Sequence, residues 1–383
     1  MKRILAILDT VVPYGKERSN VEVYRLIKER LDVRLDIVTN RKAKASLKEL
    51  MSGLDTHPVV VPNRHSKRLR LLTYLSQYIV ANIQVALLII RIRPDILMMN
   101  SEITFYNFYP ALLLFRGKIL YRIGDGPGAY RGLSFRRYNE YVWKNYILKR
   151  LTKCVFISHY IKNEMKKAGR DTSGDTVIYN YPPTRKKSDG RNEKRYKRTE
   201  GIVFGYLGQV IAIKGVHHFV ECAIKILETH PDMLFYVAGS LNYDPVYARQ
   251  TVDMVPQKYK DNIIFLGEIA DIETFFSHIN VLCVPSIKLE PLGNVIVEAK
   301  KYSRPCIVYP HGGMPELIES GVDGYVCERA DAEALMECMN HYVGNKALAK
   351  EHGMNSKKSI DRLQIGRKVF EDKWLGVFRG LGV

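Results

Sequence analysis

The chain has 383 residues, of which 46% are hydrophobic and 26% are charged. This length is too great for one ordinary core and fits two domains, and the composition excludes a disordered or fibrous chain. The 59 Lys and Arg residues outnumber the 40 Asp and Glu residues, which gives a formal net charge of +19. A surface of that sign favours anions, so nucleotide phosphates, an anionic membrane face and nucleic acid are all candidate partners.

The cysteine pattern excludes a zinc ribbon and a redox dithiol, because no Cys-x-x-Cys pair occurs. Buried, reduced thiols in a cytoplasmic protein are therefore expected. The basic start and short apolar run are interrupted at Asp9, too early for a signal peptide, so residues 4–8 are predicted to form the first strand. The six cysteines are Cys154, Cys222, Cys283, Cys306, Cys327 and Cys338.

The first residues predict a βαβ unit. A loop follows the strand at residues 4–8, and Ser19 or Asn20 caps a helix that runs to about Leu31. A second strand is expected at residues 35–39. Strands and helices continue to alternate, which is typical of an α/β protein with doubly wound parallel sheets.

Residues 67–94 are basic at both ends and strongly apolar from 79 to 92. The apolar run is shorter than the ~20 residues that span a bilayer. The interpretation we favour is a buried helix of the first domain. The alternative is a helix that lies in the plane of a membrane, where Lys67, Arg68 and Arg70 meet anionic head groups.

A glycine-rich loop follows the predicted strand at residues 118–123. Open α/β sheets bind ligands at the carboxyl ends of their strands, so Asp125 in this loop is the leading site residue of the first domain, although it could merely cap the turn. Arg131, Arg136 and Arg137 are candidates to bind an anionic or lipid-phosphate ligand. A solvated basic helix would also explain them.

The paired prolines Pro182 and Pro183, and the charged run that follows, predict a domain boundary. The first domain then covers residues 1–183 and the linker residues 184–199. The second domain covers residues 200–365, and residues 366–383 form a C-terminal helix. The basic linker could also contact nucleic acid.

The second domain contains the largest number of closely spaced candidate site residues. Glycines 205 and 208 follow a strand, and Lys214 lies at a helix start, where a pyrophosphate would bind. Farther on, Glu290 is predicted in a loop, and Glu298 in a helix that opens at Gly293. Two carboxylates placed in this way suit two groups of vicinal hydroxyls on one ligand.

With Pro285-Ser286, Gly312-Gly313 and Glu316 around these carboxylates, the sequence resembles the donor site of the group 1 (family four) glycosyltransferases. The resemblance implies the retaining GT-B fold, in which two Rossmann-like domains face a cleft and the C-terminal helix crosses back to the first domain. It also implies a UDP- or GDP-sugar donor. The implied donor-binding residues are Gly15, Gly208, Gln209, Lys214, Leu266, Glu268, Glu290, Leu292, Gly293, Asn294, Val295 and Glu298.

Within that resemblance, Lys214 and helix N-termini hold the diphosphate, Glu290 the sugar and Glu298 the ribose. Three family positions differ: Tyr14 replaces a glycine, Gly124 a histidine and Gln209 an arginine. The implied catalytic residues are Asp125, Lys214 and Glu290. No protein nucleophile is required, because the leaving diphosphate can take the acceptor proton.

The expected reaction is sugar transfer to a saccharide or lipid-linked saccharide in cell-surface polysaccharide assembly. We expect no metal or other cofactor, because no Asp-x-Asp ligand pair is seen. The expected location is the cytoplasm, with possible peripheral contact at the inner membrane face, and no nucleic acid is expected as a partner. The alternatives are a nucleotide-sugar epimerase on the GT-B scaffold and a non-enzymatic basic protein that binds membranes or nucleic acid.

Overall fold

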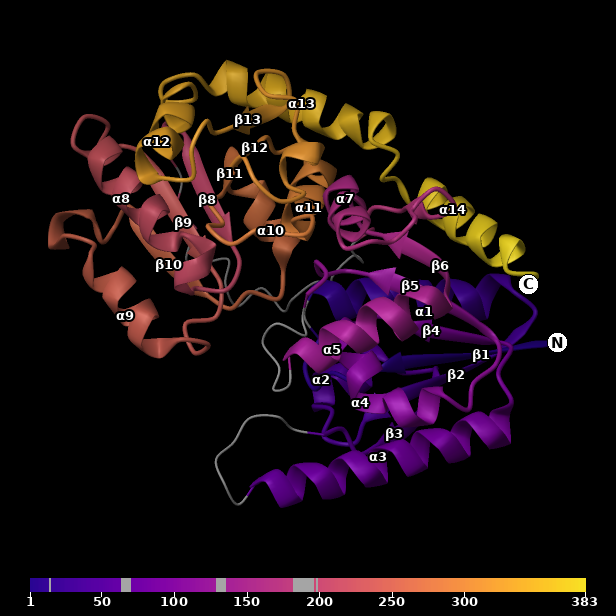
Figure 1. The fold of residues 1–383 in the computed structure, drawn as a ribbon. Coiled ribbons are helices and arrows are strands. Elements are labelled where there is room, and N and C mark those ends of the chain that lie inside the picture. The colour runs from indigo at the N-terminus through magenta and orange to yellow at the C-terminus, as the bar shows by residue number, and fades with distance from the viewer. Residues whose placement is uncertain (14, 63–69, 129–135, 182–195, 198) are drawn as a thin grey trace. The chain divides into compact units, whose positions relative to one another are not determined.

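The computed structural model describes residues 1–13, 15–62, 70–128, 136–181, 196–197 and 199–383 (Figure 1). The chain divides into two compact units. Unit 1 consists of Met1–Pro183 and Arg367–Val383, and unit 2 of Thr184–Gly366. Most of the segment predicted as a linker lies outside the described residues, and so does the predicted Arg131.

Unit 1 is built on a seven-stranded parallel sheet in the order β3-β2-β1-β4-β5-β6-β7. Its central strands are continuous apolar runs, as expected for strands covered on both faces. The order reverses direction between β1 and β4, which is the switch point of a doubly wound sheet. The strands are β1 (Lys2–Leu8), β2 (Val33–Asn40), β3 (Asp55–Val59), β4 (Ile96–Met99), β5 (Lys118–Ile123), β6 (Leu151–Phe156) and β7 (Thr176–Val177).

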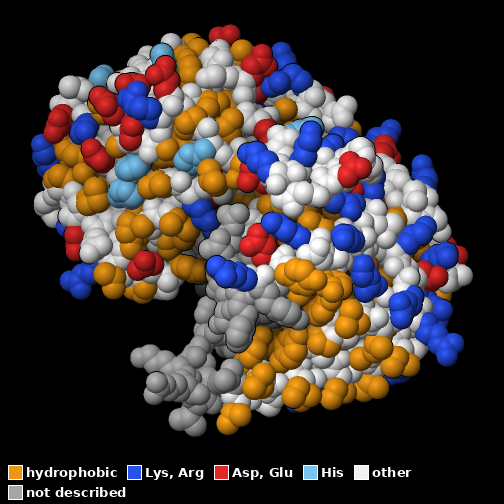
Figure 2. All heavy atoms as spheres, in the orientation of Figure 1, with side chains coloured by type: hydrophobic (Ala, Val, Ile, Leu, Met, Phe, Trp, Pro, Cys, Tyr) orange, Lys and Arg blue, Asp and Glu red, His pale blue; other side chains and the backbone are white. Residues whose placement is uncertain are grey.

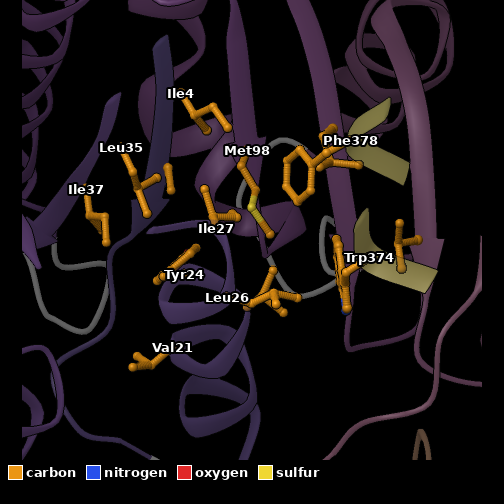
Figure 3. Packing of buried hydrophobic residues seen from close by; sticks show 14 of the residues in the cluster. Ile4, Val21, Tyr24, Leu26, Ile27, Leu35, Ile37, Met98, Trp374 and Phe378 are labelled. Carbon is orange, nitrogen blue, oxygen red and sulfur yellow. The ribbon is translucent and has the colours of Figure 1, made fainter. Parts of the chain in front are cut away.

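Helices cover both faces of this sheet. On one face, α1 packs with α14 in the main hydrophobic cluster, where Trp374 and Phe378 lie beside Leu26 and Met98 (Figure 3). On the other face, Phe105 of α4 contacts Tyr121 of β5 edge to face, with ring centroids 5.1 Å apart. The helices of unit 1 are α1 (Gly15–Arg30), α2 (Ala45–Leu50), α3 (Arg70–Ile92), α4 (Glu102–Leu112), α5 (Arg136–Val142), η2 (Trp143–Ile147), α6 (Leu148–Arg150), α7 (His159–Lys167) and α14 (Arg367–Gly380).

Unit 2 repeats the same architecture with a six-stranded parallel sheet in the order β10-β9-β8-β11-β12-β13. Two doubly wound α/β units were predicted, and this prediction is confirmed. The strands are β8 (Val203–Leu207), β9 (Leu234–Ala238), β10 (Ile263–Gly267), β11 (Val281–Val284), β12 (Cys306–Val308) and β13 (Gly324–Val326). The helices are η4 (Ala212–Lys214), α8 (Val216–Leu227), α9 (Pro245–Asp253), η5 (Gln257–Tyr259), α10 (Ile272–Ser277), α11 (Asn294–Lys301), η6 (Pro315–Leu317), α12 (Ala332–Asn340) and α13 (Lys346–Arg362).

The prediction that the cysteines are buried is confirmed for all six. The preference for a buried helix at residues 67–94 was wrong, because only 28% of its apolar window is buried. Helix α3 has 23 residues and buries only one of its faces. Its stretch Leu72–Ile92 is long and apolar enough to cross a membrane by length and composition. The sequence estimate was too short because it began the apolar run at Ile79.

Candidate functional site

The site in unit 2 lies at the carboxyl edge of its sheet, where β8 and β11 are neighbours and the chain leaves them in opposite directions. Ligands bind at such a switch point in open α/β sheets. The loops that follow the two strands are bound together, because the backbone amides of Ile287 and Lys288 both donate to the Ile213 carbonyl at 3.0 Å.

A glycine allows these loops to approach so closely. Gly215 has a φ of +68°, and a Cβ there would lie 1.8 Å from the Pro285 carbonyl oxygen. Only glycine tolerates both the left-handed conformation and the contact. The β8 loop is thereby fixed against the β11 loop, and Lys214 directly precedes this contact.

The fixed loops bring two predicted residues together. The Lys214 ammonium forms an ion pair with Oε1 of Glu290, and the same oxygen accepts a hydrogen bond from Ser286 Oγ at 2.8 Å. The side chains of Lys214 and Glu290 are 29% and 17% exposed, so a ligand can reach them. The sequence assigned these residues to different parts of one ligand, and the structure adds their direct contact.

The backbone of Glu290 is also held in place. Its carbonyl accepts a hydrogen bond from the Gly313 amide at 2.7 Å, and a Cβ at Gly312 would lie 2.3 Å from the same oxygen. His311 contacts the Ser286 carbonyl through Nε2 at 2.8 Å. The glycine pair Gly312-Gly313, which the sequence analysis singled out, therefore holds the backbone of the loop that carries Glu290.

Helix α11 begins directly after this loop. Its N-cap is Gly293, with a φ of +91°, and Asn294 and Val295 are the first helical residues. Amide groups in a first helical turn lack partners within the helix, and the helix dipole makes this end positive. An anion is the natural ligand there. Leu292 is buried and helps to anchor the turn.

The remaining predicted donor residues differ in their accessibility. Glu298 is buried within α11, and Leu266 is buried at the end of β10, whereas Glu268 is exposed just beyond it. Gly208 and Gln209 are half-buried in the loop after β8, where the Gln209 carbonyl accepts a hydrogen bond from the Tyr206 hydroxyl at 2.7 Å. Gly208, Gln209 and Glu268 directly follow strand ends on the edge that holds Glu290, and Leu266 lies in the last residues of β10 at that edge.

In unit 1, the predicted Asp125 lies just after β5 and forms an ion pair with Lys16 of α1. Its side chain is 64% exposed, so it remains available to a ligand. The predicted Gly15 is the exposed first residue of α1. Of the three predicted arginines, Arg136 is the first residue of α5 and Arg137 is exposed on that helix.

Sequence reasoning missed Asp9 as a site residue. Its carboxylate accepts hydrogen bonds from Thr104 Oγ1 at 2.9 Å and from Asn107 Nδ2 at 3.2 Å. Burial raises the pKa of Asp9, and the bonds to Thr104 and Asn107 and the charge of Lys16 oppose this rise. The signal was available, since Asp9 follows an apolar strand as closely as Asp125 does, but we used it only to exclude a signal peptide.

Glu102 was missed as well. It is buried at the N-terminus of α4, and its Oε2 accepts a hydrogen bond from the Gly128 amide at 2.8 Å. This bond links the glycine loop after β5 to the first residue of α4. Across the described residues of both units, no group of three or more His, Cys, Asp and Glu side chains is arranged to hold a metal ion.

Comparisons with known proteins relate the chain to a family and to a fold. The sequence model of the family described as glycosyl transferases group 1 matches residues 189–359. A lipopolysaccharide core biosynthesis mannosyltransferase, LpcC, from Rhizobium leguminosarum is 30% identical over 158 residues, which are 41% of this chain and 45% of that protein. A capsular polysaccharide biosynthesis glycosyltransferase, CapM, from Staphylococcus aureus is 22% identical over 182 residues, 47% of each chain.

This chain therefore aligns with about half the length of these curated relatives. The crystal structure of Anabaena HepE, in complex with UDP and glucose, resembles the whole chain with a TM-score of 0.78. It covers 99% of this chain and 100% of HepE at 18% identity, so this likeness speaks for the fold alone.

Proposed function

We propose that this chain transfers a sugar from a nucleotide-diphosphate donor to a hydroxyl group, because the model of the group 1 glycosyltransferases matches residues 189–359 and the chain has the GT-B fold. HepE binds UDP in its crystal structure, and the relatives are named for capsule and lipopolysaccharide assembly. The UDP in HepE supports a nucleotide-sugar donor, which we propose to be a UDP- or GDP-sugar. The names of the relatives support a role in cell-surface glycoconjugate synthesis, for which we propose a saccharide or lipid-linked saccharide acceptor.

The Lys214–Glu290 pair at the switch point of unit 2 is the observation that carries the proposal. In the proposed donor complex, Lys214 turns from Glu290 to the diphosphate and is joined there by the amides that begin α11. Glu290 is then free to accept hydrogen bonds from sugar hydroxyls. Preorganised charges that face a developing charge supply the largest share of many enzymatic rate enhancements.

Glu298 is proposed to hold the ribose hydroxyls. Leu266 at the end of β10 and Glu268 just beyond it are proposed to hold the base. Because Glu298 is buried, it can accept these bonds only if the ribose reaches the inner side of the first turns of α11. Carboxylates bind vicinal hydroxyls through paired hydrogen bonds, which suits this role.

We propose transfer with retention. The bond between the anomeric carbon and the phosphate oxygen breaks, the acceptor oxygen bonds to the same face of that carbon, and the acceptor proton passes to the departing phosphate. This route needs no protein nucleophile, unlike that of the retaining glycosidases. It also needs no metal where Lys214 and helix amides neutralise the diphosphate.

The acceptor is proposed to bind unit 1 at the carboxyl edge of its sheet, near Asp125, Lys16 and Asp9. Asp125 is exposed and forms an ion pair with Lys16, and in the acceptor complex it would accept a hydrogen bond from an acceptor hydroxyl in place of this ion pair. Asp9 is held by Thr104 and Asn107 and would position rather than react.

Donor screening by thermal shift, followed by turnover assays, tests the proposal. A nucleotide diphosphate at about 100 times its Kd stabilises a protein by about 2.7 kcal/mol, which raises the melting temperature by about 5–10 °C for a unit of this size. The matching nucleoside, which lacks phosphates, serves as the control and is expected to give little shift. Turnover is then measured with and without EDTA, and equal rates are expected.

Each other outcome contradicts a part of the proposal. An epimerised donor without transfer identifies an epimerase. Loss of turnover in EDTA overturns metal independence. No shift and no turnover with any nucleotide sugar overturns the glycosyltransferase proposal itself.

A further inference from the structure

Helix α3 presents a continuous aliphatic stripe to the solvent. Its members recur every three or four residues and are each between 44% and 75% exposed. Exposed apolar residues at the start and just after the end of α4 extend the stripe, and Figure 2 shows hydrophobic side chains gathered over the region where Figure 1 draws these helices. We call this surface the apolar face: Leu72, Leu75, Ile79, Ile83, Leu87, Ile90, Ile103, Leu113 and Leu114.

The opposite side of α3 is firmly attached to unit 1. Ala81, Val85, Ile89 and Ile92 are buried along it. Asn82 donates to the Asn107 carbonyl of α4 at 3.0 Å and accepts from the Ala111 amide at 3.1 Å. The helix is therefore a fixed part of the domain surface. It cannot cross a bilayer without abandoning these contacts, although its length and composition would suffice.

The charges around the apolar face are almost all positive. Helix α3 contains no acidic residue. The only acids in α4, α5, η2 and α6 are Glu102, which is buried, and Glu140, which pairs with Lys144. The cations of the same helices whose side chains the structure describes are Arg91, Arg137, Lys144, Lys149 and Arg150.

Two exposed tyrosines accompany these cations. Tyr141 and Tyr146 lie at the end of α5 and in η2, with ring centroids 5.9 Å apart. Tyrosine is enriched at the boundary between water and lipid, because its ring is apolar and its hydroxyl remains hydrated. A stripe of Leu and Ile with cationic and tyrosine neighbours is the composition of an interfacial helix.

We propose that the apolar face docks unit 1 on an anionic bilayer, with the axis of α3 parallel to the membrane. The Leu and Ile side chains enter the boundary between head groups and acyl chains, and the surrounding Lys and Arg side chains meet anionic head groups. A second copy of this chain is a poorer occupant, since pairing two such faces would bring two sets of cations together.

The chain order gives this docking a functional consequence, which rests on the proposed function. In a parallel sheet, α3 and α4 both start at the carboxyl edge, and Ile103 of the apolar face is next to Glu102, which binds the Gly128 amide. When unit 1 is bound to a membrane, the start of the glycine loop after β5, where the acceptor is proposed to bind, would thus lie close to the lipid surface. A lipid-linked acceptor could reach it without leaving the bilayer.

Vesicle cosedimentation of the full chain tests the docking without reference to activity. Vesicles of phosphatidylglycerol and phosphatidylcholine are compared with vesicles of phosphatidylcholine alone. The test variant is Ile83→Glu with Leu87→Glu, at two exposed positions whose replacement leaves the buried side of α3 intact. The matched control is Val246→Glu, an exposed apolar residue of α9 in unit 2.

We expect the native chain and Val246→Glu to sediment with the anionic vesicles, and the double variant to bind at least about tenfold less, with an unchanged melting temperature. Binding to anionic vesicles should weaken with salt. Absence of binding by the native chain, or equal binding by the double variant, overturns the proposal. If the native chain forms a dimer and does not bind vesicles, and the double variant is monomeric, the apolar face is assigned to a second copy of this chain instead. Lost turnover with intact vesicle binding would count against the proposed function alone.

Discussion

The two units have the same strand order at their switch points but build their carboxyl edges differently. In unit 2, close contacts between backbone segments determine the shape of the edge. Gly215 and Gly312 permit contacts that a Cβ would block, and the loops fixed in this way carry Lys214 and Glu290. In unit 1, the edge is shaped by side chains, with Asp9 held by Thr104 and Asn107 from α4.

This difference explains where the family signal lies. Backbone contacts require glycine at particular positions, so they leave a pattern that a sequence comparison can detect, and the family match falls on residues 189–359. The side-chain network around Asp9 joins residues about 95 positions apart in the chain. Many combinations of polar residue types could form such a network. Unit 1 therefore carries its site with little local signature.

The largest expected effect is the loss of turnover when the Glu290 carboxylate of unit 2 is replaced. We expect Glu290→Gln to lower turnover about 10²–10³-fold, because the amide keeps the shape but loses the charge that pairs with Lys214 and holds the sugar. Initial rates at saturating donor measure this effect. Glu228→Gln, on an exposed glutamate just beyond α8, is the control and should keep full activity. Turnover by Glu290→Gln within twofold of native would remove Glu290 from the site.

A backbone substitution tests whether glycine geometry shapes unit 2. Gly215→Ala is expected to lower the free energy of unfolding of unit 2 by about 3 kcal/mol, since it adds a clash with Pro285 to the cost of a left-handed alanine. Gly321→Ala is a matched control, because Gly321 has a φ of +79° with open space around its Cβ position. It should cost only about 1–2 kcal/mol. Equal losses in urea unfolding would show that the loop contact is unimportant.

Asp9 offers the corresponding test in unit 1. Its pKa is raised by burial, so the folded state binds this proton more tightly than the unfolded state. The contribution of Asp9 to stability is therefore fully present below its unfolded pKa and is lost as the pH rises through its folded pKa. Asp9→Asn should accordingly raise the melting temperature by a few degrees at neutral pH, and this gain should shrink towards pH 4.

The new amide can be accommodated, because Asn107 Oδ1 has no partner in the structure and could accept a hydrogen bond after a flip of the Asn107 amide. Asp125→Asn is the control, since its exposed side chain should leave the melting temperature unchanged. Melting curves between pH 4 and pH 8 give the comparison. A destabilised Asp9→Asn at neutral pH would contradict the assigned burial cost.

The smallest expected effect concerns Gln209, one of the positions where the chain differs from the family that it resembles. Gln209→Arg should tighten the binding of a nucleotide diphosphate about fivefold, through a charge-assisted contact to phosphate that weakens with salt. Titration calorimetry with UDP and GDP measures the change. Gln257→Arg, an exposed position in η5, adds the same charge elsewhere and should leave the affinity unaltered.

Much of the architecture could be predicted because its signals are local. The runs at residues 4–8 and 281–284 are short and continuously apolar, and both are strands. The helix after Gly293 was also predictable, because the glycine and the apolar spacing mark its start. The outward face of α3 was not predictable, since Leu and Ile residues occur on both sides of this helix and do not mark which side is buried.

The sequence by itself determined the alternation of strands and helices, the glycine positions of unit 2 and the presence of Glu290, Glu298 and Lys214, because these depend on neighbours along the chain. Only the tertiary structure decided that Lys214 meets Glu290 across 76 positions, that Asp9 is held by α4, and that one side of α3 remains uncovered. Such contacts depend on how strands are ordered in a sheet. That order is set by the packing of the whole unit and is not written in any single segment.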